Sequence, residues 1–187
     1  MAGFYKELIA AGFGGQGVMV LGQLVAYAGM NDGHNVLWIP SYGPEMRGGT
    51  ANCTTVVSEE PVGSPLVRRC DACVIFNRPS LEKFEGATRP GGVMVYNSDL
   101  IKYDKPRTDI TVIPVPADTL AAKCGSAKVA NVILLGVLVA ASGIVTKESA
   151  RKVVAEKLGG KKPEFRQMNL KALEQGFEVI DRAAERV

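Results

Sequence analysis

Short apolar runs alternate with helical repeats along the first forty residues. The run 8–13 ends in the glycine-rich segment Gly12–Gly17, and apolar residues then recur at helical spacing through residue 28. Residues 31–33, Asn-Asp-Gly, supply a stop, and residues 35–40 are typical of another strand. The pattern predicts a βαβ unit with a parallel pair of strands joined through a glycine turn and a helix.

Further apolar, β-branched runs continue the sheet, and the C-terminal third is helical. We predict four more strands, at 50–58, 72–76, 92–96 and 110–115, with a short helix at 79–84. Helical periodicity covers 117–124, 129–144, 146–158 and 163–186. The predicted fold class is α/β, a Rossmann-like three-layer sandwich with a mostly parallel sheet and a helical C-terminal segment. Without a linker or repeat, residues 1–187 are expected to form one domain.

Composition excludes several classes of protein. The formal net charge is only +3 and aromatic residues make up 6%, which argues against a nucleic-acid binder. The first residues predict no secretory signal. The apolar run 129–145 would rise about 25 Å as a helix, short of the roughly 30 Å of a bilayer core. We therefore expect a cytoplasmic protein with no membrane segment and with its four cysteines as thiols.

The turn Gly12-x-Gly14-x-x-Gly17 matches the dinucleotide-binding pattern. That pattern also needs an acid at the end of the second strand, where residues 39–42 provide none, and Asp32 precedes the strand. Nicotinamide or flavin binding is therefore not favoured. Three alternatives remain: glycine needed only for close packing, a different anionic ligand, or contact with a partner subunit.

Cysteine and histidine offer few candidates for a redox or nucleophilic centre. Cys70 and Cys73 have metal-ligand spacing, but they begin an apolar strand on which residues three apart should point to opposite faces, so we expect small buried side chains. A four-thiolate site with Cys53 and Cys124 would lack a second close pair. His34 lies in a polar turn and is expected to be solvated rather than catalytic.

The segment 41–50, SYGPEMRGGT, combines features suited to recognition. It holds a proline-fixed turn, the carboxylate of Glu45, the guanidinium of Arg47 and the Gly48–Gly49 pair. We predict an exposed, shaped loop. Alternatively, Glu45 and Arg47 form an ion pair with each other or with neighbouring loops.

Residues 12–18, GFGGQGV, together with 41–50 resemble the gamma subunit of the 2-oxoacid:ferredoxin oxidoreductases, most closely the 2-oxoglutarate type. The resemblance covers most of the chain. It implies oxidative decarboxylation of a 2-oxoacid with coenzyme A to acyl-CoA, carbon dioxide and reduced ferredoxin. Such chemistry needs thiamine diphosphate with magnesium and [4Fe-4S] clusters. Each cluster takes four closely spaced cysteines, which this chain lacks, so it is not catalytic alone.

The resemblance also implies partners and a site. Alpha, beta and delta subunits would hold the cofactors, and ferredoxin would be reached through the complex. The gamma chain would cover the active site and help bind coenzyme A. The residues placed at that contact are Gly14, Gly15, Gln16 and Gly17, as backbone donors, with Tyr42, Glu45, Arg47, Gly48 and Gly49.

Two other functions remain as alternatives. One is a self-sufficient nucleotide-dependent oxidoreductase that uses the Gly12–Gly17 turn, and the other is a binding module for a phosphate metabolite. An obligate subunit is expected to expose an apolar patch, so the isolated chain could also form a homo-oligomer.

Overall fold

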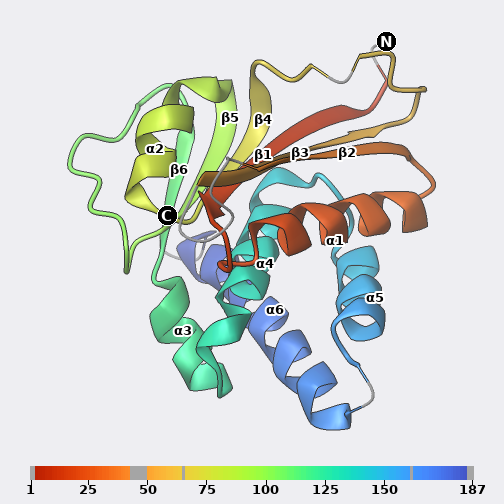
Figure 1. The fold of residues 1–187 in the computed structure, drawn as a ribbon, viewed down its shortest axis with the longest axis vertical. Coiled ribbons are helices and arrows are strands. Elements are labelled where there is room, and N and C mark those ends of the chain that lie inside the picture. The colour runs from red at the N-terminus through yellow and green to blue at the C-terminus, as the bar shows by residue number, and fades with distance from the viewer. Residues whose placement is uncertain (1–2, 43–49, 65, 161, 185–187) are drawn as a thin grey trace.

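A six-stranded sheet runs through the middle of the molecule and separates two unequal helical layers (Figure 1). The computed structural model describes residues 3–42, 50–64, 66–160 and 162–184. The strands are β1 (Tyr5–Phe13), β2 (Asn35–Tyr42), β3 (Thr50–Ser58), β4 (Cys70–Ile75), β5 (Thr88–Asn97) and β6 (Thr111–Val115). The helices are α1 (Val18–Asn31), α2 (Arg78–Phe84), α3 (Ala117–Cys124), α4 (Ala130–Ser142), α5 (Lys147–Lys157) and α6 (Pro163–Ala184), with 3₁₀ turns at Glu85–Ala87 and Ala127–Val129. The predicted α/β class and all six predicted strands are confirmed.

The strand order, β2-β3-β1-β4-β5-β6, differs from the predicted pairing at one point. β3 is antiparallel to both β1 and β2 and lies between them, while β1, β4, β5 and β6 are mutually parallel. The mostly parallel sheet is confirmed, but the prediction that the first two strands form a parallel pair is wrong. Only residues 43–49 connect β2 to β3, too few for a parallel crossover, so β3 folds back on β2 and occupies the place beside β1.

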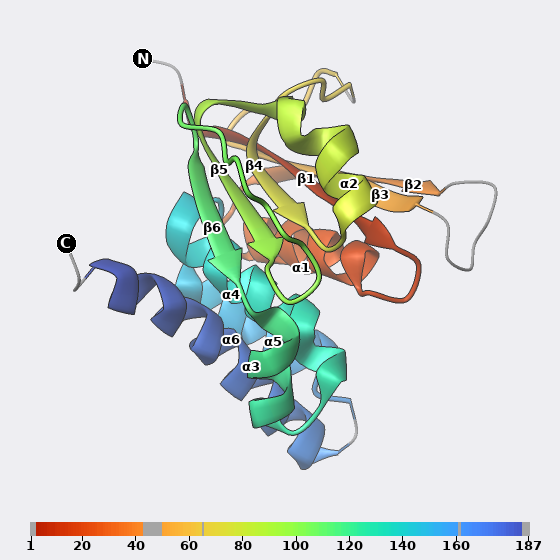
Figure 2. The same cartoon turned by 90° about the vertical axis from the view of Figure 1, so that its left-hand side faces the viewer.

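The two faces of the sheet are covered differently (Figures 1 and 2). On one face, Ile9, Cys73 and Met94 pack with Leu81 of α2. On the other face, alternating residues of the same strands, such as Leu8 and Val74, pack with α1, α3, α4, α5 and α6. This alternation follows from the two-residue period of a strand, and it produces the three-layer arrangement. None of the helices described is both long and apolar enough to cross a membrane.

Glycines allow the larger helical layer to pack closely. A Cβ atom on Gly176 of α6 would overlap the carbonyl oxygen of Ile133 in α4, and one on Gly136 would overlap that of Leu173. On α1, a Cβ atom on Gly22 would overlap the sulfur of Cys53 in β3. The backbones of α4 and α6 are therefore in direct contact, and the backbone of α1 lies directly on a side chain of β3. A larger side chain at any of these glycines would prevent this packing.

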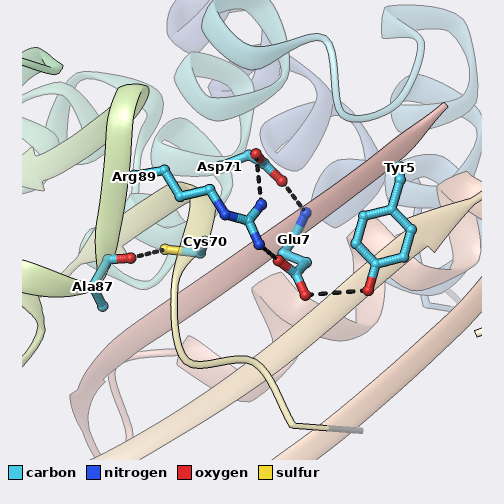
Figure 3. Close-up of polar contacts among 6 residues, drawn as sticks. All are labelled: Tyr5, Glu7, Cys70, Asp71, Ala87 and Arg89. Atoms are coloured by element: carbon cyan, nitrogen blue, oxygen red, sulfur yellow. Dashed lines mark hydrogen bonds and ion pairs between the residues drawn. The ribbon is translucent and has the colours of Figure 1, made fainter. Parts of the chain in front are cut away.

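An ion cluster ties three strands together at the edge where β1 and β4 begin (Figure 3). Arg89 of β5 donates to Glu7 Oε2 and, at 2.8 Å, to Asp71 Oδ1. Asp71 Oδ2 accepts from the backbone N–H of Glu7 at 2.8 Å. Because Glu7 is only 5% exposed, its carboxylate depends on Arg89 to offset the loss of hydration.

Asp32 connects the end of α1 to the start of α5. Its carboxylate accepts from the backbone N–H of Thr146 at 2.8 Å, from Thr146 Oγ1 at 2.6 Å and from Ser149 Oγ at 2.5 Å. Partial burial opposes ionisation, but the hydrogen bonds from Ser149 and Thr146 outweigh it and hold the pKa of Asp32 below its ordinary value of 3.8. Asp32 lies before β2 and not at its end, where an acid that binds ribose would stand. It therefore has a structural function.

We predict that Arg89→Ala lowers the free energy of unfolding by about 2 kcal/mol, because it leaves the buried Glu7 carboxylate unpaired. Urea denaturation measures the effect. The matched control is Arg78→Ala, which removes an exposed i,i+4 pair with Glu82 and should cost less than about 0.5 kcal/mol. Equal losses for the two variants would contradict the proposed role of Arg89.

We predict that Asp32→Ala costs about 1 to 2 kcal/mol at pH 7, through loss of the hydrogen bonds to Thr146 and Ser149. Because the pKa of Asp32 is lowered in the folded chain, its contribution is complete above the ordinary carboxyl pKa and is lost as the pH falls through the folded value. Urea denaturation at pH 7 and at about pH 3 should therefore show the difference between wild type and variant shrinking in acid. A difference independent of pH would show that the charge of Asp32 is not responsible.

Candidate functional site

The topology of the sheet places a crevice between the carboxyl ends of β1 and β4. β1 continues into α1 on one face of the sheet, whereas β4 continues into α2 on the opposite face. In open α/β sheets, ligands bind where successive connections diverge in this way, beyond the carboxyl ends of the strands. The Gly12–Gly17 turn lies at this point because it joins β1 to α1.

The glycines of the turn serve different purposes. A Cβ atom on Gly12 would lie 2.7 Å from Phe76 Cβ, and one on Gly17 would lie 2.5 Å from Asn131 Nδ2, so both positions require close packing. Gly15 and Gly17 have φ of 94° and 83°, in the left-handed region that favours glycine. Gly14 and Gly15 are exposed. The packing alternative therefore explains Gly12 and Gly17, while the exposed part of the turn can contact a ligand or partner.

The start of α1 is open at this turn. Gly17 is its N-cap and provides no side-chain hydrogen bond, and the first turn of the helix contains no acidic residue. The first N–H groups of a helix are left without intrahelical acceptors, and they carry the positive end of the helix dipole. The turn therefore favours an acceptor or an anion over a cation.

The Gln16 side chain bridges the crevice. Its Oε1 atom accepts from the backbone N–H of Phe13 at 2.7 Å and from Asn77 Nδ2 at 3.0 Å. Asn77 is the N-cap of α2 and accepts from the backbone N–H of Ser80 at 3.0 Å. Sequence reasoning missed Asn77, although Asn two residues before a helical proline is a recognised capping signal.

A pocket of about 270 Å³ lies beside the turn. Its polar lining comes from Gln16, Asn97, Asp118, Lys128 and Asn131, and Phe76 adds an aromatic wall. Asn97 Nδ2 donates to Asp118 Oδ2 at 2.9 Å, and Asn131 Nδ2 donates to the Gly17 carbonyl at 3.4 Å. Sequence reasoning also missed Asn97, Asp118, Lys128 and Asn131, because they come from separate segments and form no motif in the sequence.

The second motif meets the turn through strand register. Phe13 lies opposite Thr50, Gly12 opposite Ala51, and Ala51 opposite Tyr42. Two strand spacings separate Tyr42 from Gly12, about 10 Å between Cα atoms. Tyr42 is 60% exposed, while Glu45, Arg47, Gly48 and Gly49 lie outside the described residues. The structure therefore brings Tyr42 and Thr50 to the same edge as Gly14–Gly17. The predicted loop was too long at both ends, since residues 41 and 42 belong to β2 and residue 50 belongs to β3.

The same register argues against a dinucleotide site of the usual form. In that site the acid at the end of the second strand binds the ribose beside the glycine turn. Here β2 ends with Ser41 and Tyr42, and β3 separates it from β1. The strand beside the glycine turn is consequently β3, which begins at this edge with Thr50 and Ala51 and brings no acid there.

The cysteines are buried free thiols and do not fit an iron–sulfur cluster. Cys70 and Cys73 belong to the core beneath α2, whereas Cys53 and Cys124 belong to the opposite core. No group of three or more His, Cys, Asp or Glu within the described residues is placed to hold a metal ion. Burial raises the pKa of the Cys53 thiol to about 11, which keeps it protonated.

The Cys70–Cys73 pair requires one correction. The predicted opposite faces are wrong, since an irregularity in the pairing of β4 with β5 between Cys70 and Ala72 lets both side chains enter one core. Hydrogen bonding to Cys70 and complete burial raise the pKa of Cys73.

His34 is remote from the glycine turn. It precedes the first residue of β2 and stacks on Phe4, with ring centroids 4.7 Å apart. It is therefore part-buried rather than fully solvated.

Comparison with known proteins gives a consistent set of matches. Residues 7–179 match the family model described as pyruvate ferredoxin/flavodoxin oxidoreductase. The 2-oxoglutarate synthase subunit KorC of Methanocaldococcus jannaschii is 33% identical over 177 residues, which are 93% of each chain. The ketoisovalerate oxidoreductase subunit VorA of Methanothermobacter marburgensis is 42% identical over 168 residues, 89% of this chain but 34% of VorA. The chain thus spans about a third of the length of VorA.

Solved structures show the same fold. The gamma subunit of a keto/oxoacid ferredoxin oxidoreductase from Geobacter sulfurreducens has a TM-score of 0.80 and 31% identity, covering 95% of this chain and 99% of that one. The 2-oxoglutarate:ferredoxin oxidoreductase of Magnetococcus marinus, solved with 2-oxoglutarate, coenzyme A and succinyl-CoA, has a TM-score of 0.87 at 23% identity. That match covers 95% of this chain and 31% of the Magnetococcus chain, and it concerns the fold alone.

We predict that Gly17→Ala lowers the free energy of unfolding by about 2 to 3 kcal/mol, because it adds a clash with Asn131 to an unfavourable φ. Gly33→Ala is the matched control: Gly33 has the same φ of 83°, but nothing lies within 4 Å of an added Cβ atom. It should cost about 1 kcal/mol. Thermal and urea unfolding of both variants measure the difference, and equal costs would show that Asn131 does not limit the site of Gly17.

Proposed function

We propose a function for this chain from one premise: it belongs to the pyruvate ferredoxin/flavodoxin oxidoreductase family. Within that family we infer that it is the gamma subunit of a multisubunit 2-oxoacid:ferredoxin oxidoreductase. The observation that carries this proposal is the match to a separate gamma subunit over 95% of this chain and 99% of the other. We further propose that residues 1–187 act as a single domain.

The proposed reaction joins a 2-oxoacid and coenzyme A to give acyl-CoA and carbon dioxide, with two electrons passed to ferredoxin. Thiamine diphosphate would supply the electron sink for decarboxylation, and [4Fe-4S] clusters would supply the one-electron carriers. The four cysteines of this chain lie in two separate cores, which supports placing the clusters, and with them thiamine diphosphate and magnesium, in alpha, beta and delta subunits. Buried free thiols are also consistent with a cytoplasmic complex.

The contribution of this chain would be to close and shape the site. We propose that the exposed turn residues Gly14 and Gly15, with Gln16 and Gly17, present donors to coenzyme A or to the covering subunit. Tyr42 lies on the same edge, and we propose that Glu45, Arg47, Gly48 and Gly49 complete the contact. Arg47 is the best candidate for a phosphate or carboxylate, since a guanidinium is always charged and binds oxyanions bidentately.

We propose 2-oxoglutarate as the substrate, from the form of the 41–50 motif. The KorC relative carries a 2-oxoglutarate name, while VorA carries a ketoisovalerate name. The branched-chain 2-oxoacid and pyruvate are therefore the competitors to be measured.

Affinity purification of the tagged chain from its native cell tests the assignment. We expect co-purifying subunits and a CoA-dependent reduction of ferredoxin by the eluted complex, with the highest kcat/KM for 2-oxoglutarate. A chain that elutes alone and binds NAD(H) or a flavin would instead indicate a self-sufficient oxidoreductase.

We predict that Arg47→Ala lowers kcat/KM for coenzyme A or for the 2-oxoacid at least about tenfold, the value of one lost charge-assisted contact. Steady-state kinetics of the reconstituted complex measure this, and size-exclusion chromatography should show intact assembly. Arg166→Ala, which removes an exposed arginine of α6, is the matched control. Unchanged kinetics toward both substrates would contradict the assignment of Arg47.

A further inference from the structure

Two backbone N–H groups determine the orientation of two side-chain amides at the carboxyl edge of the sheet. The N–H of Phe13 can only donate, so the Gln16 atom 2.7 Å away must be the carbonyl oxygen Oε1. In the same way the N–H of Ser80 requires Asn77 Oδ1 as its acceptor. Asn77 Nδ2 is then left to donate to Gln16 Oε1 at 3.0 Å. The backbone N–H donors therefore determine which atom of each amide is the oxygen and which is the nitrogen, although the two orientations have nearly the same shape.

This relay leaves Gln16 Nε2 without a hydrogen-bond partner among the residues that the structure describes. Gln16 Oε1 accepts two hydrogen bonds, which is the capacity of a carbonyl oxygen. Gln16 Nε2 must point away from both donors, and within residues 3–42, 50–64, 66–160 and 162–184 no hydrogen bond from it is formed. Asn77 is only 4% exposed and serves as the cap of α2, so it holds the amide of Gln16 against a rigid support.

The surroundings favour an oxygen ligand for that donor. Gln16 lines the pocket of about 270 Å³ together with Lys128 and Asn131. The start of α1 adjoins the same turn with neither a side-chain cap nor an acidic residue. Asp118 also lines the pocket, and its Oδ2 is occupied by the hydrogen bond from Asn97.

We infer that Gln16 Nε2 is a preoriented donor to an oxyanion of a bound ligand in this pocket, and that Asn77 is the positioning residue that sets its direction. Preorientation increases the strength of such a contact because the donor does not need to reorganise on binding. The inference rests on the proposed function for its choice of ligand. The oxyanion is a phosphate of coenzyme A or the carboxylate of the 2-oxoacid.

The test separates a role in binding from a role in folding. Gln16→Glu keeps an acceptor for Phe13 and Asn77 but replaces the outward donor with a negatively charged oxygen, so the relay survives and the ligand is repelled. Gln167→Glu makes the same charge change at an exposed position of α6 and is the matched control. Asn77→Asp keeps the cap of α2 but removes the donor to Gln16.

The ¹⁵N-labelled full chain is titrated with coenzyme A, 2-oxoglutarate and 2-oxoisovalerate, and the Gln16 side-chain NH₂ signal is followed by NMR. We expect this signal to shift with coenzyme A if the phosphate is bound, or with the 2-oxoacids if the carboxylate is bound. Gln16→Glu and Asn77→Asp should each raise the apparent Kd at least tenfold with little change in Tm. Gln167→Glu should leave the apparent Kd within twofold of wild type.

Two results would overturn the inference: no shift of the Gln16 NH₂ signal with any of the three ligands, or equal affinity in wild type and Gln16→Glu. Failure of the proposed function has a different signature. A chain that binds an oxyanion through Gln16 but purifies without a 2-oxoacid-oxidising complex would retain the inference and lose the proposed function.

Discussion

Pairing of β1 with β3 in antiparallel register is the constraint on which the site depends. It fixes Thr50 against Phe13 and, through Ala51, Tyr42 near Gly12. Two motifs that are about thirty residues apart in sequence thereby reach one edge of the sheet. A shift of one residue would turn every side chain of β3 to the opposite face and separate the helix-facing Cys53 and Thr55 from α1.

The two edges of the sheet divide stability and recognition between them. At the edge where β1 begins, Arg89 forms ion pairs with both Glu7 and Asp71 and joins three strands. At the carboxyl edge, neutral amides lie beside the charged Asp118 and Lys128, and the amides of Gln16 and Asn77 are held by backbone donors. An edge fixed by charge–charge contacts can support the sheet while the other edge keeps donors available for a ligand, because paired strands connect the two edges.

Local patterns predicted most of the elements but not their neighbours. The two-residue and 3.6-residue periods located six strands and the helices, and the proline at position 79 marked the start of α2. The insertion of β3, the common core of Cys70 and Cys73, and the polar lining from Asn97, Asp118, Lys128 and Asn131 were not predicted. Each depends on contacts between segments that are distant in sequence, and a local period carries no information about such contacts.

Residue type and short-range spacing were enough to predict the secondary structure and the glycine turn, because both depend on local preferences. The tertiary structure decided which turn and which strand ends meet, and it selected Asn77 as the residue that orients Gln16. Strand order depends on the length of connections and on burial of both faces at once, and the direction of the Gln16 amide depends in part on Asn77, a donor distant in sequence that caps α2.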